Sequence, residues 1–74
     1  MARLPRISGA DAVRALKKFG WRVARHRGSH MIMIKTGHSA SLSVPQHREL
    51  APGTLRALIR TAGLTVEEFI KRLD

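Results

Sequence analysis

The sequence contains no cysteine, and this absence excludes several kinds of protein chemistry. Disulfides, thiolate nucleophiles and cysteine-based zinc sites are ruled out, so any metal would need histidine and carboxylate ligands. The composition fits a reducing compartment. A chain of 74 residues buries only ~60% of its unfolded surface on folding, so one small hydrophobic core must stabilise it.

Long hydrophobic runs are absent as well. The N-terminus has no apolar stretch of signal-peptide length, and no segment approaches the ~20 apolar residues of a membrane span. We therefore expect a single domain over residues 1–74 that is soluble and cytoplasmic and has no membrane partner.

Acidic residues are scarce: five Asp and Glu stand against 14 Lys and Arg, which gives a formal net charge of +9 and a pI of about 11.8. The excess is concentrated in residues 1–35, where nine basic residues accompany one acid, Asp11. A basic surface binds nucleic acid through the release of counterions, so RNA or DNA is the expected partner. An acidic protein or an anionic surface could exploit the same charge.

The first helix is predicted by a capping signal followed by helical periodicity. Ser8 is the candidate N-cap, and Asp11 stands three residues later near the positive end of the helix dipole. Apolar residues then recur at helical spacing as far as Phe19, and Gly20 is the expected left-handed stop.

The C-terminal third predicts one bent helix or two short ones. A helix opens over residues 52–54, where Pro52 suits the first helical position, and it stops at Gly63. Thr65 and Glu68 then form a capping box for a last helical piece, which favours a structural role for that carboxylate over a catalytic one.

Three antiparallel strands are predicted between these helices, over residues 21–27, 30–35 and 40–44. Gly28 and Ser29 supply the turn between the first two strands, and proline follows the third. The predicted fold is therefore α+β: a helix, a three-stranded sheet, and one or two C-terminal helices packed on the same sheet face. The double-stranded RNA-binding domain has this shape.

The second strand alternates methionine with isoleucine, and this pattern leaves its orientation open. One pair faces the helices and the other lies on the open side of the sheet. His30 shares the parity of the isoleucines, so it would turn toward the helices if that pair does, unless the strand begins after it.

Four histidines are the candidates for chemistry near neutral pH, and two familiar arrangements fit them poorly. His26 and His30 are four residues apart, but a Gly-Ser turn separates them and no acid lies nearby, which disfavours a metal site. A Ser-His-Asp triad needs an orienting acid, and Asp11 is the only acid outside the C-terminal half of the chain, where Glu49 lies in a loop. We interpret His26 and His38 as surface residues.

A site with few acidic and many basic side chains is suited to RNA cleavage. A histidine can take the proton of the 2′-hydroxyl while cations stabilise the charge that develops on phosphorus. His30 lies between Arg25, Arg27 and Lys35 in the sequence, and this arrangement favours such a role. The plainer interpretation is that His30 only begins a strand.

Further cations and the single tryptophan could contact RNA in other ways. Arg14, Lys17 and Lys18 form either a solvated helix face or a set of phosphate contacts. Trp21 could stack on a base, but a tryptophan after a helix-ending glycine is more typical of a core or rim position. Aromatic residues make up only 4% of the chain, so low sequence preference is expected.

Several short motifs, in order and at matching spacing, resemble the HicA family of small bacterial mRNA interferase toxins. The likeness spans nearly the whole chain and includes both the start and the end of the first predicted helix. The motifs are Leu4-Pro5, Ser8-Gly9, Leu16-Lys17-Lys18-Phe19-Gly20-Trp21, Gly28-Ser29-His30, Val44-Pro45-Gln46-His47, Gly53-Thr54-Leu55-Arg56 and Ala62-Gly63-Leu64.

The resemblance implies a toxin that cleaves mRNA without a metal or cofactor and is neutralised by a HicB-like antitoxin. It places the catalytic histidine at His30, with Gly28 and Ser29 as its structural setting, and aligns His47 with a second recurrent histidine of open role. Trp21 stands where the family usually has phenylalanine, and the residue after the catalytic histidine is a methionine where a bulkier or polar residue is common.

The sequence thus favours a toxin endoribonuclease in which His30 acts as general base or acid. Arg25, Arg27 and Lys35 are expected to hold the phosphates, and the turn residues Gly28 and Ser29 are expected to contact RNA as well. Two other classes compete with it. A noncatalytic RNA-binding module would use the same fold and charge and leave His30 incidental. A small subunit that docks an acidic protein would use the charge alone.

Overall fold

The structure is a computed structural model that describes residues 3–73 of the expected 1–74 domain, and its elements follow the predicted order. None of the described helices is long and apolar enough to cross a membrane. The architecture is α+β and consistent with the double-stranded RNA-binding domain fold. Its elements are α1 (Gly9–Lys17), β1 (Arg22–Arg27), β2 (His30–Ile34), β3 (Leu42–Pro45), α2 (Pro52–Thr61) and α3 (Val66–Lys71).

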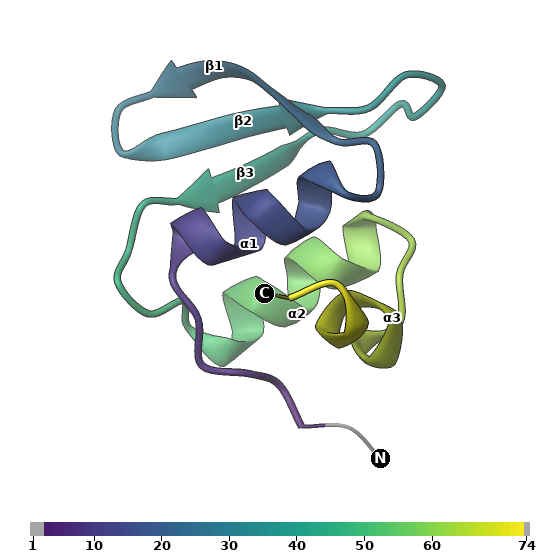
Figure 1. Ribbon diagram of the computed structural model, residues 1–74. Coiled ribbons are helices and arrows are strands. Elements are labelled where there is room, and N and C mark those ends of the chain that lie inside the picture. The colour runs from purple at the N-terminus through teal and green to yellow at the C-terminus, as the bar shows by residue number, and fades with distance from the viewer. Residues whose placement is uncertain (1–2, 74) are drawn as a thin grey trace.

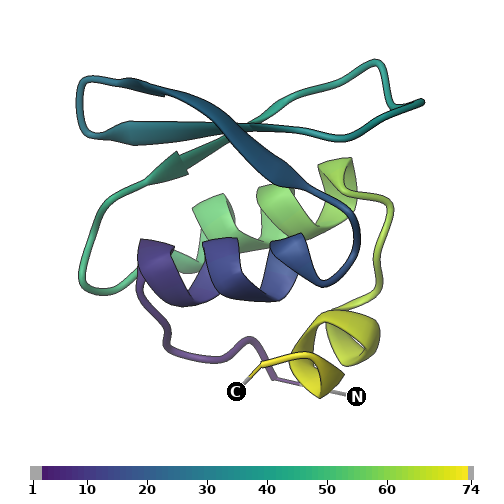
Figure 2. The same ribbon diagram turned by 45° about the horizontal axis from the view of Figure 1, so that its top comes forward.

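The three strands form one antiparallel sheet in the order β1-β2-β3 (Figure 1). Helices α1 and α2 lie side by side beneath one face of the sheet, as the sequence predicted, and α3 packs against α2 farther from the sheet (Figure 2). The other face, called the open face below, carries no helix in the part of the chain described.

The predicted capping boxes of α1 and α3 are confirmed. In each, the N-cap hydroxyl accepts a hydrogen bond from the backbone N–H three residues later, and the carboxylate there accepts one from the N-cap N–H. The backbone N–H of Ser8, above all, lowers the pKa of Asp11 below its ordinary value of 3.8. The N–H of Thr65 does the same for the pKa of Glu68. Both side chains are therefore ionised at neutral pH and support helix starts.

Helix α1 ends two residues earlier than the periodicity predicted, at Lys17 in place of Phe19. The next residues tighten into turns, because the N–H of Phe19 bonds back to the carbonyl of Leu16. Gly20 has a φ of 95°, and the N–H of Trp21 also bonds to the Leu16 carbonyl. The glycine thus ends the helical segment as predicted. The predicted and observed ends of α1 differ only because its last turn is not regular α-helix.

The core fills the space between the sheet and the helices. The two methionines of β2 and the apolar residues of β3 supply its sheet side, and Phe69 of α3 closes it from below. Trp21 is only 2% exposed and its ring contacts that of His38, with centroids 4.8 Å apart. Trp21 is therefore a core residue and not a platform for bases, and His38 is a half-buried loop residue that covers it.

The end of β3 meets the start of α1 at very close range. Strand β3 begins at Leu42, two residues later than predicted. It continues through Pro45, one residue further than predicted, because Pro45 still pairs with His30 on this edge strand. The N–H of Gly9 donates a hydrogen bond to the carbonyl of His47, over 2.9 Å. A Cβ atom at Gly9 would lie 2.0 Å from the Pro45 carbonyl oxygen, so only glycine permits this contact.

Candidate functional site

The open face of the sheet brings arginines, a histidine and a serine together. Residues that pair across antiparallel strands point to the same face, so the observed register assigns each side chain to a side. The face comprises Arg22, Arg25 and Arg27 from β1, His30, Ile32 and Ile34 from β2, and Ser43 from β3.

A β-bulge in β1 determines which of its side chains reach this face. The register shifts between Val23 and Arg25, so that Ala24 is the extra residue and has no partner in β2. Val23 pairs with Met33 on the core side, whereas Arg25 pairs with Ile32 on the open face. In a regular strand, residues 23 and 25 would share one face. The bulge therefore places Arg25 and Arg27 beside the histidine of β2.

His30 begins β2 on the open face. Met31 and Met33 belong to the buried core, so the parity that the sequence left open is decided, and His30 does not face the helix layer. Its side chain is half-buried. Its Nδ1 atom lies 2.8 Å from the Oγ atom of Ser43 on the neighbouring strand. One ring nitrogen is therefore engaged in this contact, and Nε2 is the second ring nitrogen.

Two guanidinium groups accompany the imidazole. Arg27 lies directly opposite His30 in the β1–β2 pairing, and Arg25 is two residues farther along β1 on the same face. Both are exposed, and neither forms an ion pair with a carboxylate of residues 3–73. Their charge is not neutralised within the described domain, so the surface around His30 attracts anions.

The turn before His30 is held by its own geometry and by the end of β3. Gly28 has a φ of 59°, which suits the first central position of a type II′ hairpin turn. The carbonyl of Ser29 accepts a hydrogen bond of 2.8 Å from the N–H of Gln46. Gly28 and Ser29 thus form the turn that leads into His30, and both are exposed.

Lys35 lies at the opposite end of β2 from His30. Five residues of extended chain span about 16 Å, so the two are neighbours in sequence and not in the site. The aliphatic stem of Lys35 passes over Gly20, where its Cε atom would lie 3.3 Å from a Cβ placed on the glycine. The structure brings Arg25 and Arg27 to His30 and leaves Lys35 apart.

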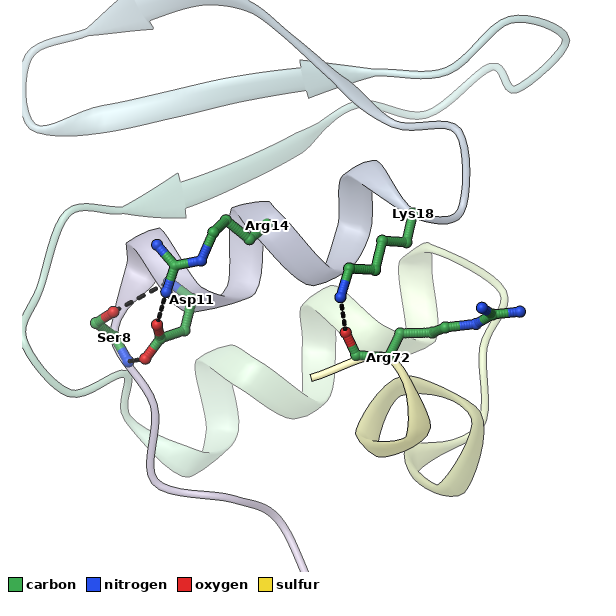
Figure 3. A network of polar contacts seen from close by, with 5 residues as sticks. All are labelled: Ser8, Asp11, Arg14, Lys18 and Arg72. Carbon is green, nitrogen blue, oxygen red and sulfur yellow. Dashed lines mark hydrogen bonds and ion pairs between the residues drawn. The ribbon is translucent and has the colours of Figure 1, made fainter. Parts of the chain in front are cut away.

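The predicted basic face of α1 lies on the other side of the sheet from His30, because α1 packs beneath the core side. Arg14 is paired with Asp11, and the Nζ atom of Lys18 donates a hydrogen bond of 2.9 Å to the Arg72 carbonyl (Figure 3). Lys17 is exposed in the last turn of α1. These cations do not form one site with His30.

His47 lies in the loop between β3 and α2, close to the start of α1. Its side chain is exposed and borders a shallow hollow of about 280 Å³ that Met31 and Arg48 also line. Since Met31 lies on the core side of the sheet, this hollow and the open face are on different sides of β2. Among residues 3–73, no three histidine or carboxylate side chains converge as metal ligands.

Two parts of this arrangement could not be found by sequence reasoning. Arg22 joins the open face, although among the arginines of β1 the sequence analysis singled out Arg25 and Arg27 alone. Ser43 reaches His30, whereas the alternation of polar and apolar residues over 40–44 in the sequence indicates only that Ser43 faces away from the core. The polar character of Ser43 in the third strand is the feature that could have drawn attention to it. The sequence does not show which residue Ser43 contacts, because this depends on the strand register.

The chain matches the model of a known family. The model of the family described as "HicA toxin of bacterial toxin-antitoxin" matches residues 9–64, from the first residue of α1 to just beyond α2. The matched span contains the whole sheet and every open-face residue named above. No curated protein matches the chain significantly.

Proposed function

The chain belongs to the family of HicA toxins of bacterial toxin–antitoxin systems, and from this premise we propose that it is an endoribonuclease that cleaves mRNA. The observation that carries the proposal is the imidazole of His30, half-buried on the open face beside two arginines that form no ion pair within residues 3–73. Such a group can transfer a proton at neutral pH, and the arginines can bind the phosphate on which charge develops.

In the proposed reaction, the RNA provides its own nucleophile. The oxygen of a 2′-hydroxyl attacks the adjacent phosphorus, and the bond from phosphorus to the 5′-oxygen breaks. His30 assists as the base that takes the 2′-hydroxyl proton, or as the acid that protonates the 5′-oxygen, with water handling the other proton. Arg25 and Arg27 stabilise the pentavalent phosphorane. The products are a 2′,3′-cyclic phosphate and a 5′-hydroxyl.

The same surface favours RNA binding with little preference for base sequence. Trp21 and Phe69 are buried, and Phe19 packs against the core, so the open face offers no aromatic platform. Recognition of unpaired bases relies on such platforms, whereas phosphate contacts carry no sequence information. As its partner we propose an acidic, HicB-like antitoxin, which the net charge of +9 would attract. We propose that the toxin acts in the cytoplasm.

Purified protein should cleave RNA in the presence of a chelator, because the proposed chemistry uses only side chains and the ribose hydroxyl. The fragments should end in a 2′,3′-cyclic phosphate or a 3′-phosphate, as measured by mass spectrometry. A matched RNA with 2′-deoxyribose at the cleaved positions should remain intact. Binding without cleavage would favour a noncatalytic RNA-binding module, and absence of binding at low salt would favour a subunit that docks acidic proteins.

Replacement of Arg25 and Arg27 should lower the affinity for RNA and should also make that affinity less sensitive to salt. For the Arg25→Gln/Arg27→Gln protein, the slope of log affinity against log salt should fall by roughly 0.7 for each phosphate that the protein no longer neutralises. Titration with a 2′-O-methyl RNA, which cannot be cut, measures this slope. The Arg56→Gln/Arg60→Gln protein has the same charge removed from the surface between α2 and α3. Equal slopes in the two variants would contradict a binding role for the open face.

A further inference from the structure

The closest polar partner of His30 is a serine on the neighbouring strand. His30 pairs with Pro45 in the sheet, and Ser43 is two residues before Pro45 in β3. The two side chains are thus diagonal neighbours on the open face, at a separation that an imidazole can span. The His30 Nδ1 atom lies 2.8 Å from Ser43 Oγ, a normal hydrogen-bond distance.

We propose that Ser43 is the positioning residue of the site: it accepts the Nδ1 proton of His30, so that Nε2 is the nitrogen that exchanges a proton with RNA. This inference rests on the proposed ribonuclease activity. A neutral imidazole has one donor and one acceptor nitrogen, so Nδ1 must carry the proton if Nε2 is to take one from RNA. The Ser43 hydroxyl, 2.8 Å from Nδ1, can accept that proton. The bond also restricts rotation of the imidazole ring. A freely rotating ring would spend less time with Nε2 aligned to the 2′-hydroxyl.

A hydroxyl suits this site better than the carboxylate that orients histidine in many hydrolases. A negative charge beside His30 would repel the phosphate that Arg25 and Arg27 attract. The serine is neutral and leaves the surface cationic. Its oxygen can also accept from Nδ1 whether or not Nε2 carries a proton, so the contact survives both halves of a proton-transfer cycle.

The backbone holds both side chains in place. Ser43 lies between Leu42 and Val44, which are 1% and 0% exposed. In the sheet, Ser43 pairs with Ile32 of β2. His30 is followed by Met31, which is also buried. Packing on the core side therefore fixes the two strands that carry the contact on the open side, as a preorganised site requires.

Loss of the Ser43 hydroxyl should slow the chemical step without weakening RNA binding. We expect Ser43→Ala to reduce kcat by about 10- to 100-fold, the scale of a small misplacement of a catalytic group, while KM changes less than about twofold. Ser43→Thr restores a hydroxyl on a side chain that strands accept readily, and should keep most of the rate. Ser41→Ala is the matched control, because Ser41 is an exposed serine two residues earlier, outside β3.

The protonation of the ring gives a second measurement that does not depend on activity. In ¹⁵N-labelled protein, the imidazole nitrogen spectrum of neutral His30 should show the proton on Nδ1, and Ser43→Ala should convert it to a mixture of tautomers. Wild-type kcat together with an unchanged tautomer in Ser43→Ala would overturn the proposal. If instead the wild-type protein does not cleave RNA at all, the ribonuclease function fails, while the nitrogen spectrum still reports whether the contact forms.

Discussion

His30→Ala protein should cleave RNA about 100- to 10,000-fold more slowly than the wild type, because acid–base catalysis by one positioned side chain contributes a factor of that order. The fold should persist. His30 lies on the open face outside the core, and its described side-chain hydrogen bond is the one with Ser43. Loss of one such bond costs only about 0.5–1.5 kcal/mol. Initial rates on a defined RNA, with thermal unfolding of each variant, measure both effects.

His26→Ala is the matched control for this experiment. His26 is an exposed histidine in β1, but it pairs with Met31 and therefore lies on the other side of the sheet from the open face. Its loss should leave the cleavage rate within about twofold of the wild type. If His30→Ala and wild type cleave equally fast, the imidazole has no part in the reaction, and the arginines alone would have to account for it.

Gly9→Ala should lower the free energy of unfolding by about 1–3 kcal/mol, the usual effect of an added group in a packed region. The new Cβ would lie 2.0 Å from the Pro45 carbonyl oxygen and 3.1 Å from its carbon, so the backbone of α1 or of β3 would have to shift. Gly9 also donates its N–H to the His47 carbonyl. For a domain of this size, each kcal/mol corresponds to about 4–8 °C in Tm, so calorimetry will resolve the change.

Gly53→Ala tests whether the effect is specific to the close approach at Gly9. Gly53 lies in the first turn of α2, its φ is not positive, and a Cβ there would meet no atom within 4 Å. The substitution should leave the unfolding free energy unchanged or raise it by up to about 1 kcal/mol, since alanine favours helix. Equal Tm values for the two variants would show that α1 and β3 do not need this close approach.

Because Pro45 pairs with His30, Gly9→Ala should reduce cleavage as well.

Local signals were sufficient to predict the elements of this fold. Ser8 and Thr65 start helices through capping boxes that the sequence displays, and Gly20 and Gly63 adopt the positive φ expected after helices. These features depend on residues a few positions apart, and the physics that governs them is equally local. The differences at Lys17 and Pro45 amount to one or two residues at element ends, where hydrogen bonds to neighbouring segments decide the boundary.

The cationic site around His30 was predicted for a reason that is only partly correct. Nearness in sequence selected Arg25, Arg27 and Lys35, and the structure brings only the two arginines to the histidine. A strand extends by about 3.3 Å per residue, so residues at its two ends are far apart even when few residues separate them. The arginines reach the open face because Ala24 is bulged, and no local feature of this segment indicates that bulge.

The sequence by itself determined the number, order and kind of elements, the excess of positive charge and the family likeness. It also singled out His30, whose catalytic role stays a prediction. Only the tertiary structure decided that His30 faces away from the helices, that Arg25 and Arg27 join it, and that Ser43 contacts its ring. The physical reason is that helix caps and strand alternation are local, whereas strand register and bulges are chosen by the packing of Met31, Met33 and Val44 against helices distant in sequence.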